Sequence, residues 1–186
     1  MADETKSPED AAKESFERRS ALTIAILAAI CAYASLGAGN SNTDTLLSAT
    51  NAADQWAYFQ AKSVKGHTYE VQKDLAEVLL PTSVDEAKRK SFVEHCAKQT
   101  ERYAKEKDEA KAEAEKSEAN VKVSAQKNSN YGVAALILQI AIVITSISIL
   151  VRKNALYFGG TLIGLAGAAI AGLTAAGIKF TIMLPY

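Results

Sequence analysis

Apolar residues gather in three blocks of the chain, and polar residues fill the stretches between them. The blocks are 20–38, 131–151 and 155–184, and none of them contains an acidic residue. A membrane-spanning helix needs about 20 predominantly apolar residues, so the second and third blocks qualify and the first is at the short end of the range. The pattern predicts an all-α membrane protein with three transmembrane helices.

The first block has a second interpretation as a secretory signal peptide. Arg18-Arg19 would form its basic start, and Ala32-Tyr33-Ala34 would form its cleavage site. However, a polar tail, residues 1–19, places many acidic residues before the apolar run. We therefore expect the block to be retained as a transmembrane helix.

Basic residues beside the blocks predict the orientation. Arg18-Arg19 precede the first block, and Arg152-Lys153 lie between the second and the third. Short basic flanks favour the cytoplasmic side. The N-terminus is then expected in the cytoplasm, and residues 39–130 and the C-terminus are expected outside it.

The long polar stretch, 39–130, reads as two helices. The first should open near Ser41, although a helix could also run unbroken from the first block through Gly37 and Gly39. The second should open near Ser83, where Glu86 three residues later makes a capping-box pattern. Pro81 marks a turn near 80–82. Because both helices must return to one membrane surface, we expect a long antiparallel hairpin outside the bilayer.

Contact between these helices requires a matching face on each of them. The second helix carries a stripe of mostly small residues at alternating steps of four and three, a heptad pattern that permits close pairing; a solvated helix held by Glu–Lys pairs is the alternative. Its positions are Cys96, Thr100, Tyr103, Lys107, Ala110, Ala114, Ser117, Val121 and Ser124. One possible face of the first helix consists of Leu46, Ala49, Ala53, Trp56, Gln60, Ser63, His67, Val71 and Val78.

The third block is rich in small residues. Gly160, Gly164, Ala168 and Gly172 recur at steps of four, which places them on one helix face. Membrane helices associate by close packing, which small residues allow. This face is expected to pack either on the other two spans or on a second copy of the chain.

Aromatic residues of the first polar helix carry a recognisable pattern. Asp54-Gln55-Trp56-Ala57-Tyr58-Phe59-Gln60-Ala61-Lys62 follows the first block and precedes the charged helix and two further spans. This arrangement resembles the membrane-protein family called domain of unknown function 4337, from about Arg18 to Tyr186. The resemblance implies a bacterial envelope protein, here placed in the inner (plasma) membrane, and transfers no catalytic residue.

Few residues suggest chemistry. His67 and His95 lie at equal distances from Pro81 and could meet in a hairpin, near Cys96 and Glu70, but their spacing is poor for metal ligands. We expect no metal and no cofactor. The two cysteines, Cys31 and Cys96, are too far apart in the predicted topology for a disulfide. No nucleophile-elbow or phosphate-loop motif occurs, and the formal net charge of zero argues against nucleic acid as a partner.

These observations favour a non-enzymatic membrane scaffold or accessory subunit, in a homo-oligomer or a larger membrane complex. Its interaction residues would be Trp56, Tyr58, Phe59 and Tyr103, because aromatic side chains anchor interfaces; the same cluster could be the core of the hairpin. The alternative is an oligomeric channel or transport component lined by the glycine-rich third span, although no acidic residue lies within any span.

Overall fold

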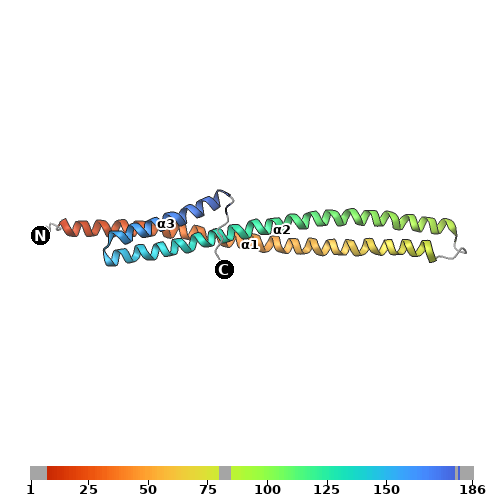
Figure 1. The fold of residues 1–186 in the computed structure, drawn as a ribbon, viewed down its shortest axis with the longest axis horizontal. Helices are drawn as coiled ribbons and strands as arrows, with labels where there is room; N and C mark the ends of the chain where they lie inside the picture. Colours follow the sequence, from red (N-terminus) through yellow and green to blue (C-terminus); the bar gives the residue numbers. More distant parts are fainter. Residues whose placement is uncertain (1–7, 80–84, 179, 181–186) are drawn as a thin grey trace, which may run out of the picture. The chain divides into compact units, whose positions relative to one another are not determined.

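The structure, a computed structural model, describes residues 8–79, 85–178 and 180. All regular secondary structure in these residues is helical (Figure 1): α1 is Pro8–Leu79, α2 is Glu86–Val151 and α3 is Asn154–Ala175. Each helix contains a stretch that is long and apolar enough to cross a membrane, judged by length and composition. The predicted all-α class is therefore confirmed.

Helix α1 is continuous where the sequence suggested interruptions. We expected a new helix to open near Ser41 after Gly37 and Gly39, but helical conformation runs through all three residues. A glycine inside a helix costs only about 1 kcal/mol relative to alanine. Thr43 also bonds within the helix, since its hydroxyl donates to the carbonyl of Gly39 at 3.1 Å. The expected helix start at Ser41 was wrong.

Helix α2 begins with an acidic cap. The side chain of Asp85 accepts a hydrogen bond from the backbone N–H of Ala87 at 3.0 Å, which satisfies one of the open donors of the first turn. The predicted cap, Ser83, and the predicted turn at 80–82 lie outside the described residues. Within the described chain, Asp85 performs the role that the capping-box pattern assigned to Ser83.

Helix α3 is shorter than the apolar block 155–184 and ends at Ala175. Gly177 has a φ of 74°, a left-handed conformation that glycine adopts without strain. The N–H of Gly177 donates to the carbonyl of Thr174 at 3.1 Å, and that of Ile178 donates to Leu173 at 3.1 Å. These bonds form a Schellman motif, which ends the helix regardless of the hydropathy that follows.

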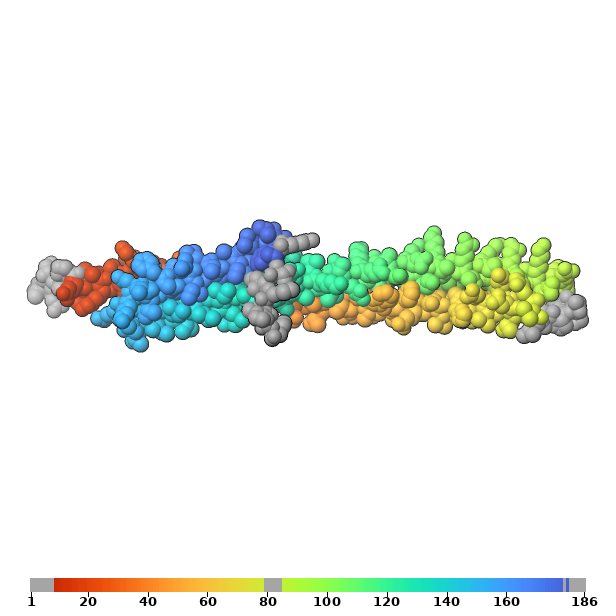
Figure 2. Space-filling view, in the orientation of Figure 1, coloured from red at the N-terminus to blue at the C-terminus, as the bar shows by residue number. Residues whose placement is uncertain are grey.

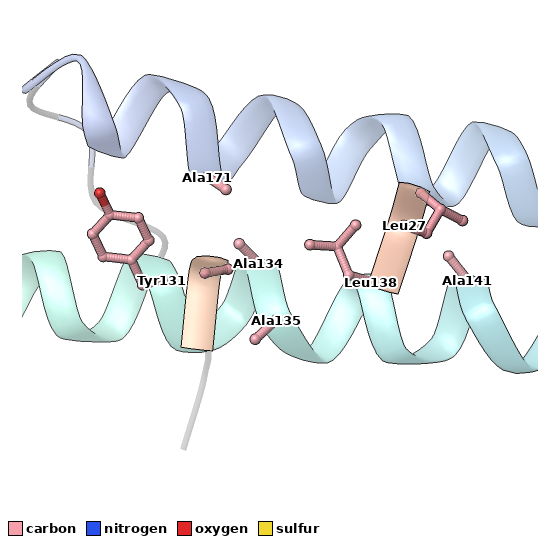
Figure 3. Close-up of a cluster of buried hydrophobic side chains, with 8 residues drawn as sticks. Leu27, Tyr131, Ala134, Ala135, Leu138, Ala141 and Ala171 are labelled. Atoms are coloured by element: carbon pink, nitrogen blue, oxygen red, sulfur yellow. The ribbon is translucent and has the colours of Figure 1, made fainter. Parts of the chain in front are cut away.

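The chain divides into two compact units. The first unit comprises Met1–Thr43 and Val123–Tyr186, and it holds the beginning of α1, the end of α2 and all of α3. Its buried cluster consists mainly of small side chains from the three helices (Figure 3): Leu27, Ala34, Tyr131, Ala134, Ala135, Leu138, Ala141 and Ala171. Small side chains bring helix backbones close together, which is how helices associate in lipid.

The second unit, Asp44–Lys122, is the hairpin. Trp56 of α1 contacts Glu118 of α2, whereas Tyr69 contacts His95, so the two helices run antiparallel. Figure 2 shows the two helices packed directly on each other in this unit. All of the predicted stripe on α2, from Cys96 to Ser124, is buried or half-buried, so the stripe does face inward.

The predicted face of α1 was wrong. Of its nine residues only Trp56 is half-buried, and the other eight are exposed. The residues that face α2 instead follow steps of three and four: Thr45, Ser48, Ala52, Gln55, Phe59, Lys62, Gly66, Tyr69, Lys73 and Ala76. The prediction followed the larger aliphatic residues, whereas the contact follows small and amphipathic ones, which leaves the aliphatic residues outside.

Candidate interaction site

The predicted aromatic residues lie at one stretch of the hairpin, on both helices. Phe59 and Tyr103 are half-buried in the contact between α1 and α2. Trp56 is half-buried beside Phe59, with ring centroids 5.4 Å apart in an edge-to-face arrangement. Tyr58 is largely exposed. Three of the four residues therefore contribute to the packing of the hairpin itself.

Lys62 connects these aromatic rings to a carboxylate. Its amino group donates a hydrogen bond to Glu106 across the helix pair, and it lies 4.7 Å from the ring centroid of Tyr58 and 5.3 Å from that of Tyr103. A cation over an aromatic face is attracted by the ring quadrupole. Arg102 donates a second hydrogen bond to Glu106 at 2.7 Å. One carboxylate thus accepts from two cations, and one cation spans two tyrosine rings.

Three further contacts extend the cluster along the hairpin. The indole N–H of Trp56 donates to Glu118 at 2.8 Å. Tyr69 stacks on Tyr103 with centroids 5.7 Å apart, and His95 meets the edge of Tyr69 at 6.2 Å. These polar and aromatic contacts each join residues of both helices. They fix the register of α1 against α2, which small seam residues alone would leave open.

The charges of the cluster shift one another's pKa. Hydrogen bonds from Lys62 and then Arg102 lower the pKa of Glu106, because both favour the ionised carboxylate. The hydrogen bond to Glu106, followed by that to Tyr58, raises the pKa of Lys62. The Lys62–Glu106 pair therefore remains charged across the neutral range.

A pH dependence follows from Glu106. A lowered carboxylate pKa stabilises the fold above the unfolded pKa of about 4.3, and this contribution disappears as the pH falls through the folded value. We expect the thermal midpoint of the hairpin to be level between about pH 6 and pH 9 and to fall in acid. Glu106→Gln should lower the midpoint at neutral pH and flatten the acid slope, as followed by circular dichroism. An unchanged slope in this variant would mean that other carboxylates cause the acid effect.

Sequence reasoning missed Lys62, Tyr69 and Glu106. Each sits on the observed contact face, and a search for a second stripe at steps of three and four through Ala52 and Phe59 would have included Lys62 and Tyr69. Glu106 lies beside the predicted α2 stripe, next to Lys107. No sequence signal identifies its partner, because the register between the helices sets that contact.

The small residues of α3 form a second contact, in the first unit. Gly160, Gly164, Gly167, Ala171 and Thr174 are buried. A Cβ on Gly160 would lie 2.4 Å from Thr145 Oγ1 and 3.0 Å from its backbone nitrogen, and one on Gly164 would lie 2.6 Å from Leu27. At Gly160 the added Cβ would meet backbone atoms, so glycine is required there for the close approach of α3, whereas at Gly164 it would meet the end of a flexible side chain.

The second half of the predicted glycine pattern does not make this contact. Ala168 is only half-buried, and Gly172 is exposed, with nothing within 4 Å of an added Cβ. Gly167 takes that place, since a Cβ there would lie 2.9 Å from Leu138. The prediction extended a step of four along the helix, whereas packed helices follow alternating steps of four and three.

The two histidines have separate surroundings. His67 is exposed on α1 and its Nδ1 lies 3.2 Å from Glu70, whereas His95 lies against Tyr69. Cys96 is buried in the hairpin contact. Among the described residues, no group of three or more His, Cys, Asp or Glu side chains could hold a metal ion.

Comparison with known proteins adds one finding. The model of a family described as a domain of unknown function (DUF4337) matches residues 16–177. Neither the curated proteins nor the solved structures give a match to the chain.

Proposed function

Since the chain belongs to the DUF4337 family, whose description assigns no activity, we propose its function from its surface: a non-enzymatic integral membrane scaffold or accessory subunit. In this proposal the three apolar helical stretches lie in a bacterial inner membrane, with the N-terminus in the cytoplasm and the hairpin outside it. The hairpin mediates protein–protein contacts. The observation that carries the proposal is an apolar stripe on the outer face of α1.

The stripe is defined by the large aliphatic residues of α1 that face away from α2. Its members are Leu46, Leu47, Val64, Val71, Leu75 and Val78, and all are exposed, from 42% for Val71 to 79% for Val78. Small residues such as Ala53 and Ala57 continue it between Leu47 and Val64. Exposed aliphatic residues aligned along one helix face are typical of an interaction site. By contrast, the outer residues of α2 are mostly Lys and Glu, which water solvates well.

The stripe best fits a second copy of itself. Thr50, Ala57, Val64, Val71 and Val78 recur every seven residues and carry no charge, so two parallel copies can oppose identical residues without repulsion. From Leu46 to Val78 the stripe runs about 48 Å along a helix about 10 Å wide, or roughly 500 Å² per copy. The total of about 1,000 Å² is at the lower limit for a specific interface. Anchoring in one membrane raises the effective concentration of the two hairpins.

Cross-linking tests this proposal in membranes. In a chain with Cys31→Ala and Cys96→Ala, we expect Val64→Cys to form a disulfide-linked dimer on mild oxidation. Ala112→Cys, on the exposed outer face of α2, is the matched control and should stay monomeric. Adding Val71→Asp to the Val64→Cys chain should reduce the dimer about tenfold, because an unpaired charge would be desolvated in the contact.

Equal cross-linking at residues 64 and 112 would indicate random collision and would remove the homodimer proposal. The proposal would also be wrong if neither Val64→Cys nor Ala112→Cys formed a disulfide-linked dimer while circular dichroism showed an intact hairpin. A channel lined by α3 has no comparable observation in its favour, since the buried glycines of α3 already contact α1 and α2.

A further inference from the structure

A cavity of about 410 Å³ lies in the first unit, between the beginning of α1 and the junction of α2 and α3. Three basic side chains line it, Lys13, Arg19 and Arg152, and so do three aromatic ones, Phe16, Tyr157 and Phe158. The contacts of the hairpin do not involve this cavity.

The basic side chains come from two separate parts of the chain. Lys13 and Arg19 belong to α1, whereas Arg152 lies in the two-residue turn between α2 and α3. One carboxylate, Glu17, also lines the cavity, and it lies 3.9 Å from Arg152 Nη2. Outside the lining, the carboxylate of Asp10 lies 3.7 Å from Lys13 Nζ. Three cations beside these two carboxylates still leave a net positive charge at the cavity, which favours an anionic ligand.

The backbone of Arg152 is unusual. Its φ is 54°, the only positive φ of a non-glycine residue in the described chain. Glycine adopts this conformation without steric strain, whereas a residue with a Cβ atom does not, because the Cβ comes too close to a backbone carbonyl oxygen. Strained positions of this kind cluster at binding sites, where the surrounding structure holds them. The turn therefore places a guanidinium at the cavity at a conformational cost.

The aromatic residues form a wall with a polar edge. Phe16 meets Tyr157 edge-on at 5.9 Å, and Tyr157 meets Phe158 at 5.5 Å. The hydroxyls of Tyr157 and Thr23 are hydrogen-bonded at 3.0 Å, which joins α3 to α1. Rings with one apolar and one wet end are typical of the membrane–water boundary.

Exposed aliphatic residues lie within a few positions of the cavity lining on each neighbouring element. They are Leu22 and Ile26 on α1, Leu150 at the end of α2 and Leu162 on α3. A ligand with an anionic head and apolar chains would match this order of cations, aromatic rings and aliphatic side chains. Basic sites between membrane helices bind the head groups of anionic lipids in this way.

We propose that this cavity binds an anionic phosphate group, and that the phosphate belongs to a phospholipid head group rather than to a free ion. Arg19 and Arg152 donate to the phosphate oxygens, since guanidinium groups match that geometry. The aromatic wall covers the glycerol region. The lipid assignment rests on the proposed membrane location, while the phosphate chemistry rests on the cavity alone.

Native mass spectrometry of the full chain in non-ionic detergent tests the proposal. The probes are dioleoyl phosphatidylglycerol, dioleoyl phosphatidylcholine and inorganic phosphate, each added alone. We expect phosphatidylglycerol to bind in preference to the other two. Arg19→Gln with Arg152→Gln should weaken its binding on the order of 20-fold. The matched control is Arg18→Gln with Lys153→Gln, which removes the same two charges from neighbouring residues outside the cavity lining and should change binding less than threefold.

Glu17→Gln gives a result in the opposite direction. Removing the competing carboxylate should tighten phosphatidylglycerol binding about threefold, and a misfolded chain could not show such a gain. If the Arg19/Arg152 double variant and the Arg18/Lys153 double variant lost phosphatidylglycerol binding equally, the attraction would be a non-specific property of the surface, and the proposed site would be wrong. Equal binding of inorganic phosphate would overturn the lipid assignment.

The membrane premise is checked separately by carbonate extraction of the wild-type chain. Release into the supernatant would contradict the proposed membrane location, whereas a retained chain without a head-group preference would contradict only the cavity proposal.

Discussion

Gly160→Ala is expected to loosen the packing of α3 on α2, whereas Gly172→Ala should be neutral or stabilising. An added Cβ at residue 160 meets the side chain and backbone nitrogen of Thr145 and, at 3.2 Å, the carbonyl of Ala141. Backbone atoms cannot swing aside, so the helices must separate. Overpacking of this kind costs about 1–3 kcal/mol. At Gly172 nothing lies within 4 Å, and alanine gains up to about 1 kcal/mol of helix propensity.

The thiol of Cys31 reports this packing. It is half-buried in the first unit and donates to the carbonyl of Ala135 at 3.8 Å. In a Cys96→Ala chain it is the only thiol. We expect Gly160→Ala to become labelled by a small membrane-permeant maleimide at a lower concentration of dodecyl sulfate than the parent. Gly172→Ala should be labelled at the same concentration as the parent or a higher one.

Gly164→Ala should have an intermediate effect. Its Cβ would meet the terminal methyl groups of Leu27, which lie at the end of a flexible side chain and can move. Identical labelling of the 160 and 172 variants would contradict the close approach of α3.

Ala114→Leu should separate the two helices in the middle of the hairpin. Ala114 is fully buried between α1 and α2, and its neighbours Ala110 and Ser117 on the same face are also small. A leucine there has no space, and the cost is again about 1–3 kcal/mol. Ala112→Leu is the matched control, because residue 112 is exposed and leucine is nearly as good a helix former as alanine.

The measurement uses the single tryptophan of the full chain. Trp56 donates to Glu118, one helical turn from Ala114, so opening of the hairpin here should expose the indole and shift its emission to longer wavelength. Amide exchange of the same segment should accelerate at least about tenfold, which corresponds to 1.4 kcal/mol. If the emission of Ala114→Leu did not shift to longer wavelength and matched that of Ala112→Leu, the contact between α1 and α2 would tolerate large residues.

The helical class and the approximate extent of the apolar segments follow from composition. The inward stripe of α2 was also readable, since its small residues keep steps of four and three amid charged ones. The face of α1 that contacts α2 could not be predicted in the same way. Its contact residues include Lys62, Lys73 and Gln55, which resemble surface residues, while its largest aliphatic residues face outward.

The candidate interaction site shows the same division. Sequence reasoning selected Trp56, Tyr58, Phe59 and Tyr103 because aromatic residues are large and anchor contacts. The contacts of Trp56 with Glu118 and of Lys62 with Glu106 could not be predicted, because each joins residues that are 44 or more positions apart. Only the register of the antiparallel helices brings them together.

The chain by itself determined which segments are helical and which are apolar enough to cross a membrane, because propensity and hydropathy are local properties that sum along a helix. The tertiary structure decided which face of each helix is covered, and that Arg152, Arg19 and Lys13 line one cavity. Those outcomes depend on how closely two backbones approach and in what register, and a local pattern does not contain that information.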